Sequence, residues 1–177
     1  AGALHHDIGK LAIPIFFIEN QNTGFNPHNE LSYEESAQTI ISHVTNGIKL
    51  AYKHSLPEPI IDFIRTHHGT SKTKYFYNRY VAENPDKPID STIFTYKGPR
   101  PFSRETAVVM MVDAVEAASR SLKNHSESEI SKLVDNIINS QIEDEQFSNS
   151  DITFKDVDKI KDLLKKKLQS IYHVRIE

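Results

Sequence analysis

The pair His6-Asp7 stands near the start of the chain and is closely followed by Lys10. An imidazole nitrogen and a carboxylate that can bridge two ions are adjacent here. Mixed nitrogen and oxygen donors suit divalent first-row metals such as Mn, Fe, Co and Zn. Two ligands do not make a site, so the pair predicts a metal centre only if further metal-competent residues follow.

Three later histidines lie on or at the end of predicted helices. His43 is on the edge of the apolar stripe of a helix predicted over about 33–53, and His67 and His68 end the next helix. Each also has a structural interpretation: His43 as a core histidine bonded to a carbonyl, and the pair as neutral side chains that interact with a helix dipole. Two adjacent histidines make the second alternative weaker.

Asp113 lies in a predicted helix that is apolar on nearly every side over Ala107 to Val115. An ionised carboxylate in such surroundings costs several kcal/mol unless it is paired, hydrogen-bonded or metal-bound. Arg120 is the local partner for a buried ion pair, although Glu116 competes for it at the better i,i+4 spacing. We favour metal ligation, because Asp113 completes a consistent series. The candidate ligands are His6, Asp7, His43, His67, His68 and Asp113.

Helices must position these side chains, and local signals mark where they begin and end. Ser32-x-x-Glu35 is a capping box before the helix at 33–53. The second helix starts near Pro57, and Gly69 is a common left-handed cap after it. Ser103 caps the helix that carries Asp113.

The remaining segments are two loops and two structural helices. The segment 13–31 is rich in turn-forming residues and is expected to be a long loop, in which Phe16 and Phe17 contact the core. The segment 84–102 is expected to be irregular. Amphipathic helices are predicted over about 126–146 and 153–170.

Composition narrows the class of protein. The 177 residues are 38% hydrophobic and 25% charged, which is typical of a globular chain, and we expect one domain over 1–177. The net charge of −3 argues against binding of a nucleic-acid polymer. The longest apolar run, 107–112, is far shorter than the ~20 residues of a membrane-spanning helix, so we expect no membrane contact by this chain. There is no cysteine, which excludes thiolate ligands.

The sequence begins at Ala1 without a methionine and runs directly into the His-Asp pair. We therefore expect a piece truncated on its N-terminal side, with one or more upstream helices missing.

The ordered ligands resemble the HD superfamily of metal-dependent phosphohydrolases. In that family the ligand order is His, His-Asp, then His, His-His and Asp in the two-metal members. The order in this chain matches from His6-Asp7 onward, and the first histidine of the pattern would fall upstream of Ala1. The resemblance implies an all-α fold, an HD-domain helical bundle with a metal site between its helices.

Within the superfamily the chain is most similar to the cytosolic catalytic domain of the PgpH-type seven-transmembrane-receptor HD family. The HD-GYP branch would show a Glu after the His pair and a later Gly-Tyr-Pro, whereas this chain has Gly69 and Thr70 after the pair. The similarity covers nearly the whole chain. The motifs that carry it are 5–10, 16–21, 26–28, 41–44, 67–70, 112–117 and Tyr172-His173-x-Arg175-Ile176.

This resemblance implies a phosphodiesterase that hydrolyses the cyclic dinucleotide c-di-AMP to linear pApA, with two divalent metal ions, Mn or Fe. It also implies a cytoplasmic domain of a membrane-anchored parent protein. The expected reaction uses a hydroxide that bridges the two metal ions and attacks the scissile phosphate. Two alternatives stay open: an HD-type hydrolase of mononucleotides or phosphomonoesters, and a non-catalytic nucleotide-sensing HD module.

Ligand chemistry assigns roles within the site. Asp7 is the expected bridge, because a carboxylate has two oxygens and an imidazole has one free nitrogen. We expect His6 and Asp113 on one metal ion, and His43, His67 and His68 on the other.

A cation near the phosphate would neutralise its charge. Lys10 is the first candidate for this catalytic role, and Arg120 is the second. The segment from Arg65 to Arg79 combines four basic residues with three aromatic ones and contains no acid. It is interpreted either as a positive patch beside the His pair or as a solvated helix face. Adenine is expected to stack on Tyr75 or Tyr77.

Overall fold

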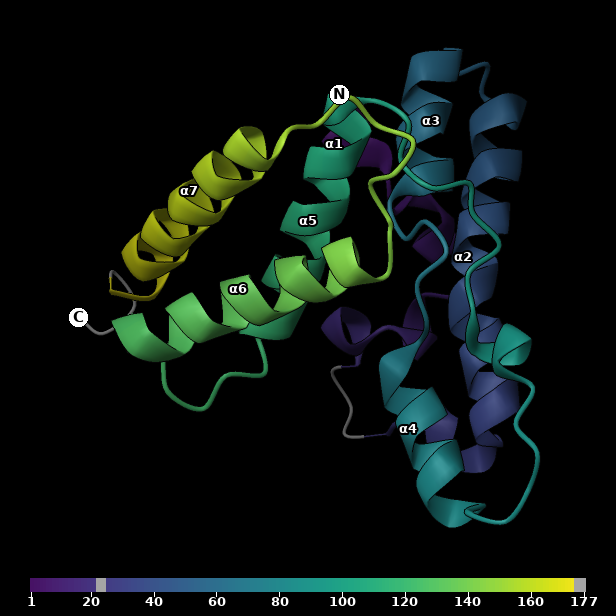
Figure 1. The fold of residues 1–177 in the computed structure, drawn as a ribbon. Coiled ribbons are helices and arrows are strands. Elements are labelled where there is room, and N and C mark those ends of the chain that lie inside the picture. Colours follow the sequence, from purple (N-terminus) through teal and green to yellow (C-terminus); the bar gives the residue numbers. More distant parts are fainter. Residues whose placement is uncertain (22–24, 174–177) are drawn as a thin grey trace. The chain divides into compact units, whose positions relative to one another are not determined.

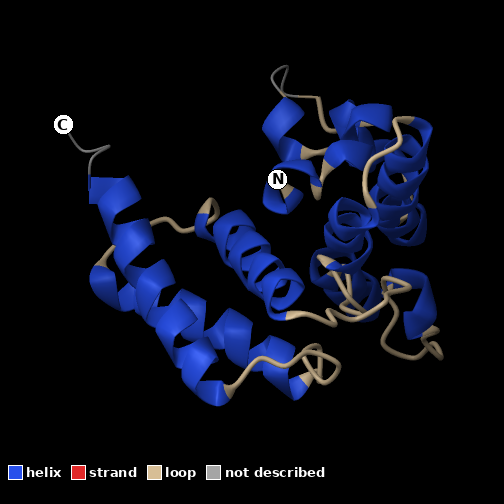
Figure 2. Ribbon diagram, turned by 90° about the horizontal axis from the view of Figure 1, so that it is seen from above, coloured by secondary structure: helices blue, strands red, loops and turns tan. Residues whose placement is uncertain are grey.

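Helices form every regular element in the part of the chain that the computed structural model describes, residues 1–21 and 25–173. Figure 2 shows the same result by colour. The chain divides into two compact units, Ala1–Pro99 and Arg100–Glu177, which we describe separately. The all-α prediction is confirmed, and the expectation of one domain over the whole chain stays a prediction.

The first unit is built from four α-helices and a set of short 3₁₀-helices in its described residues (Figure 1). The α-helices are α1 (Gly2–His5), α2 (Tyr33–Lys53), α3 (Glu58–Thr66) and α4 (Lys74–Glu83). The 3₁₀-helices are η1 (Ile8–Ala12), η2 (Pro14–Phe16), η3 (Ile18–Asn20), η4 (Pro27–Glu30) and η5 (Ser91–Phe94).

Helix α2 is the longest helix in the described part of this unit, and its predicted bounds, about 33–53, are confirmed. The Ser32 hydroxyl accepts a hydrogen bond from the Glu35 N–H, and the Glu35 carboxylate accepts one from the Ser32 N–H, so the predicted capping box is present. Ala51 of α2 packs with Ile61 and Ile64 of α3 in a small buried cluster. This packing brings the C-terminal end of α3 beside α2.

The end of α3 differs slightly from its prediction. The helix begins after Pro57, as expected, but it ends at Thr66, with His67 as its C-cap. Gly69 follows with a φ of 51°, a conformation that costs glycine little. Both histidines therefore lie in the turn after α3, where the chain changes direction.

The predicted irregular segments contain only short helical turns in their described residues. The 13–31 segment holds η2, η3 and η4, while Asn22 and Gly24 lie outside the described residues. Phe17 is buried, as expected, and Phe16 is half-buried. The 84–102 segment contains η5, and an isolated bridge joins Thr95 to Lys72.

The second unit is a helical hairpin and a third helix, and all three helices were predicted. They are α5 (Arg104–Ser119), α6 (Glu127–Glu143) and α7 (Phe154–His173). The Ser103 hydroxyl caps α5 by accepting a hydrogen bond from the Thr106 N–H. The buried core of this unit is Ala107, Met110, Met111, Val115, Ile130, Val134, Ile138, Phe147, Val157 and Leu168.

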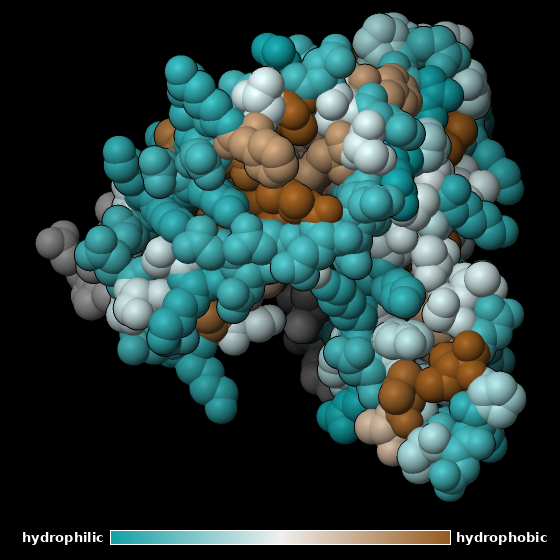
Figure 3. Space-filling model, in the orientation of Figure 1, coloured by the Kyte–Doolittle hydropathy of each residue, from teal (hydrophilic) through white to brown (hydrophobic). Residues whose placement is uncertain are grey.

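Hydrophilic residues cover most of the face drawn in Figure 3. In the described ranges, every helix is too short or too polar to cross a membrane. The last motif of the resemblance lies mainly outside these ranges, because residues 174–177 are not described.

Candidate metal centre

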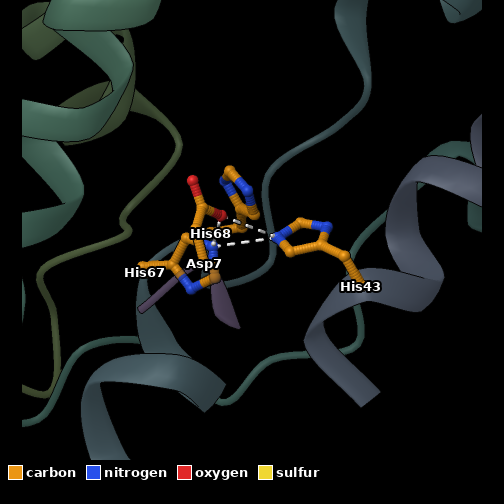
Figure 4. A group of neighbouring side chains, drawn as sticks. All are labelled: Asp7, His43, His67 and His68. Carbon is orange, nitrogen blue, oxygen red and sulfur yellow. Dashed lines mark hydrogen bonds and ion pairs between the residues drawn. The ribbon is translucent and has the colours of Figure 1, made fainter. Parts of the chain in front are cut away.

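Four of the predicted ligands come together inside the first unit. The side chains of Asp7, His43, His67 and His68 each offer a ligand atom, and these atoms lie within 4.8 Å of one another. Figure 4 shows that His43 approaches from α2 while the other three side chains meet it from the opposite side. The group could hold a metal ion.

Backbone carbonyls orient two of these imidazoles. The Nδ1 atom of His43 lies 2.6 Å from the carbonyl oxygen of Ile40, and Nδ1 of His67 lies 2.8 Å from that of Ile64. A carbonyl only accepts, so each Nδ1 carries the proton and each Nε2 keeps its lone pair. This arrangement is typical of histidines that bind metal through Nε2.

The contacts among these ligand atoms fit a cation. Nε2 of His43 and Nε2 of His67 are 3.0 Å apart, so two lone pairs face each other. Asp7 Oδ1 is 3.4 Å from the first and 3.5 Å from the second, is buried, and accepts no hydrogen bond within the described residues. A buried polar atom without a partner is costly, and a divalent ion would satisfy all three atoms.

The second oxygen of Asp7 faces a different set of groups. Oδ2 lies 3.3 Å from His6 Nε2 and 2.7 Å from Lys10 Nζ. His6 is oriented in the same way as the other histidines, since its Nδ1 is 2.7 Å from the carbonyl oxygen of Ala3. The two oxygens of Asp7 therefore point to two groups of partners, as a bridging carboxylate requires, although the bridging role itself stays a prediction.

A close backbone contact holds Asp7 beside α2. Gly9 packs directly on this helix, so that a Cβ atom at Gly9 would lie 1.8 Å from the His43 carbonyl oxygen and 2.5 Å from the Gly47 nitrogen. Only a residue without a side chain fits here. Gly9 and Gly47 thus let η1 approach α2 closely enough for Asp7 to reach His43.

Comparison with known proteins gives the family of this chain. The family model described as HD domain matches residues 1–118. The chain belongs to the HD domain family. The predicted resemblance is confirmed, and the Asp7 and His43 group lies within the matched range.

Two curated relatives of the HD domain chain are named cyclic-di-AMP phosphodiesterase PgpH. The protein from Bacillus subtilis is 43% identical and the one from Listeria monocytogenes is 40% identical, each over 99% of this chain. The chain spans only 24% of the length of either relative.

Crystal structures of the L. monocytogenes PgpH HD domain have the same fold. The structure in complex with cyclic-di-AMP is 39% identical, with a TM-score of 0.92 over 97% of this chain and 79% of that chain. The other structure is 38% identical, with a TM-score of 0.89 over 97% of this chain and 80% of that chain.

Lys10 of the HD domain is held between two carboxylates. Its Nζ atom lies 2.7 Å from Asp7 Oδ2 and 2.8 Å from Glu19 Oε1. Burial opposes the charged form of Lys10, but the nearby carboxylates raise its pKa above the ordinary value. Burial likewise opposes ionisation of Asp7, yet the neighbouring imidazoles of His6 and His67 and the charge of Lys10 hold its pKa well below the ordinary value. Both side chains are therefore charged at neutral pH.

Two residues at the site were not found from the sequence. Glu19 appeared only within a family motif, and its contact with Lys10 depends on how the short 3₁₀ turns fold. Tyr96 is buried, and its ring stacks on His68 with centroids 4.2 Å apart and an angle of 27°. It lies in the irregular 84–102 segment, where no periodic pattern marked it.

The predicted ligand Asp113 and the predicted cation Arg120 belong to the second unit. Asp113 is half-buried on α5. Arg120 pairs with Glu116, with NH2 2.8 Å from Oε2, so the competition expected from the i,i+4 spacing is observed. Roles in the site for Asp113 and Arg120 stay predictions.

The two tyrosines predicted to stack on adenine have different surroundings on α4. Tyr75 is 65% exposed, with the Arg79 guanidinium 5.8 Å from its ring centre. Tyr77 packs against Phe94 with ring centres 5.6 Å apart, and Lys72 Nζ lies 4.8 Å from the centre of its ring. Tyr75 therefore has more free ring surface for a base than Tyr77, and stacking by either residue stays a prediction.

The buried histidines make the stability of the metal-free HD domain depend on pH. Burial, together with neighbouring His67, lowers the pKa of His43 to about 4, and burial lowers that of His68 as well. Below about pH 6.5 these two imidazoles therefore bind protons in the unfolded chain but not in the folded chain. We expect the free energy of unfolding to fall as the pH drops from about 6.5 to about 4, by up to roughly 3 kcal/mol from His43.

Urea unfolding in the presence of a chelator, at several pH values in this window, measures the effect. Titration of Asp7 contributes only at the acidic end of the window, because its folded pKa is lowered and its unfolded pKa of about 3.9 lies at that end. A His43→Gln variant serves as the control and should show a shallower slope. A free energy of unfolding that stays constant or rises on acidification contradicts the expectation.

Proposed function

We propose that this HD domain hydrolyses c-di-AMP to linear pApA. The observation that carries the proposal is the Asp7 carboxylate, whose two oxygens face two different sets of metal-competent or cationic groups. The proposal is also supported by 43% and 40% identity to proteins named cyclic-di-AMP phosphodiesterase and by a TM-score of 0.92 to an HD domain crystallised with this dinucleotide.

Metal ions, Mn or Fe, are part of the proposal. The residues of the first unit that would hold them are Asp7, His43, His67 and His68 for one ion and Asp7 and His6 for the other, and Asp113 stays a predicted ligand of the second ion. Divalent ions bound to such ligands neutralise phosphate charge and lower the pKa of a bound water. The mixed nitrogen and oxygen donors suit these metals.

The residues of the chain prepare the site before substrate arrives. The carbonyls of Ile40 and Ile64 fix the tautomers of His43 and His67, so no reorientation is needed at the moment of reaction. Lys10 brings a positive charge next to Asp7, where it can donate hydrogen bonds to phosphate oxygens. Overall, one water molecule is added and one bond between phosphorus and the 3′ oxygen is broken, which opens the ring to pApA.

The cellular setting is also a proposal. We place the domain in the cytoplasm as part of a membrane-anchored protein, because the motifs are similar to those of the cytosolic domains of the seven-transmembrane-receptor HD family. Localisation of the full-length protein by fractionation of cells tests this placement.

Incubation of the purified chain with Mn²⁺ and c-di-AMP tests the proposed reaction. We expect pApA as the product, resolved by chromatography, and no product when a chelator is added. A panel with c-di-GMP, mononucleotides and a phosphomonoester tests specificity. Faster hydrolysis of a monoester would favour the broader hydrolase, and tight binding of c-di-AMP by the metal-loaded chain without turnover would favour a sensing module.

A further inference from the structure

A single ammonium group is shared by two carboxylates at the edge of the metal centre. Lys10 Nζ is 2.7 Å from Asp7 Oδ2 and 2.8 Å from Glu19 Oε1. The Lys10 side chain is 25% exposed and the Glu19 side chain 33%. Ammonium has three donors and no acceptor, so it can bind both carboxylates at once.

This contact creates a competition for Asp7 Oδ2. The same oxygen lies 3.3 Å from His6 Nε2, on the side where a metal ion would bind Asp7 and His6 together. A metal ion and an ammonium group cannot both take the same lone pair of the oxygen at close range, because the two cations repel. Lys10 and a metal ion bound by Asp7 and His6 therefore compete for Oδ2.

Glu19 offers Lys10 a partner that does not move with Asp7. It lies in η3, which follows the buried Phe17, and the Asn20 N–H donates to the Phe17 carbonyl oxygen at 2.9 Å. The Phe17 ring packs against His43 with centroids 5.6 Å apart and lies under Lys10, whose Nζ is 5.0 Å from the ring centre. The segment that carries Glu19 is thus packed against the metal centre itself.

We propose that Glu19 is a positioning residue that retains the Lys10 ammonium when Asp7 Oδ2 binds a metal ion. Lys10 then stays beside the site, ready to neutralise phosphate charge, without blocking the ligand. This inference rests on the proposed metal-binding role of Asp7, but not on the identity of the substrate.

The charges of the three residues give the direction of the effect. Asp7, Lys10 and Glu19 together carry a net charge of about −1, which attracts a divalent cation. In Glu19→Gln the three residues are neutral overall, and Lys10 has Asp7 as its sole carboxylate partner among these three. The loss of charge slightly weakens the attraction for a divalent cation, and the loss of the second carboxylate partner strengthens the competition between Lys10 and the metal ion, which is the larger effect.

Isothermal titration calorimetry of the chain with Mn²⁺ tests the proposal. We expect Glu19→Gln to weaken Mn²⁺ binding by about 10- to 100-fold, the usual range for a residue that supports a metal ligand. Glu30→Gln, at an exposed glutamate of η4, is the matched control and should bind like the unchanged chain. Thermal unfolding with a chelator present verifies that each variant is folded.

A double-mutant cycle separates positioning from a general loss of structure. Lys10→Met removes the competing cation, so Mn²⁺ binding should be at least as tight as in the unchanged chain, while turnover falls. In the Lys10→Met background, Glu19→Gln should change Mn²⁺ affinity by less than about threefold, since its main effect acts through Lys10.

Equal losses of affinity in both backgrounds, or no loss in Glu19→Gln alone, overturn the proposal. Absence of Mn²⁺ binding by the unchanged chain overturns it together with the metal role of Asp7. A failure of the proposed reaction can be told apart from a failure of this inference. If the Mn²⁺ affinities follow the expected double-mutant cycle but c-di-AMP is not hydrolysed, the role of Glu19 is supported and the proposed reaction is not.

Discussion

Asp7→Asn is expected to abolish hydrolysis of c-di-AMP, with a loss of at least about 10³-fold in kcat/KM. The amide keeps the shape of the side chain but loses its charge, and its NH₂ group can only donate. In one orientation that group meets Lys10, and in the other it meets the Nε2 atoms of His43 and His67. Loss of several kcal/mol of charge stabilisation corresponds to this factor.

Steady-state kinetics with saturating Mn²⁺, together with metal analysis of the purified variant, measures the effect of Asp7→Asn. Asp86→Asn is the matched control, because Asp86 is exposed on the 84–102 segment. Turnover within about tenfold of the unchanged chain would rule out a bridging role for Asp7.

Gly9→Ala is expected to have the largest effect on the fold of the first unit. The added Cβ would lie 1.8 Å from the His43 carbonyl oxygen and 2.5 Å from the Gly47 nitrogen. Both are backbone atoms of α2, so η1 has to move away from the helix. Overpacking costs about 1–3 kcal/mol when side chains can shift, and we expect at least the upper end here. The shift also separates Asp7 from His43, so metal affinity should fall as well.

Urea unfolding and Mn²⁺ titration of Gly9→Ala measure these two losses. Ala12→Ser is the control, because it adds one heavy atom at an exposed position of the same 3₁₀-helix. If Gly9→Ala unfolds and binds Mn²⁺ like the unchanged chain, the close contact between η1 and α2 is not what positions Asp7.

The sequence alone was sufficient to place α2, α3, α5, α6 and α7, because their signals are local, whereas a helix at α4 was only one of two alternatives for the segment from Arg65 to Arg79. Capping residues such as Ser32 and Ser103 satisfy the first N–H groups of α2 and α5, and apolar residues at helical spacing set the buried faces. The candidate ligands could also be predicted, since the HD pattern is an order of residues along the chain. The contacts of individual atoms were not, because they join segments far apart in the chain.

His43 illustrates the limit of local reasoning. Its two interpretations, a core histidine bonded to a carbonyl or a metal ligand, looked exclusive in the sequence. In the structure, Nδ1 donates to the Ile40 carbonyl while Nε2 faces Asp7 and His67, so the first contact prepares the second. The sequence gives the residue type at position 43, but it does not give the direction in which each ring nitrogen points.

The sequence by itself determined the all-α class, the positions of α2, α3, α5, α6 and α7, and the candidate ligands of this HD domain. Only the tertiary structure decided that Asp7 Oδ1 faces His43 and His67 while Oδ2 faces His6 and Lys10. It also decided the parts played by Glu19, by Tyr96 and by the contact of Gly9 with α2. The physical reason is that such contacts depend on the packing of short turns against helices, which leaves no periodic pattern in the chain.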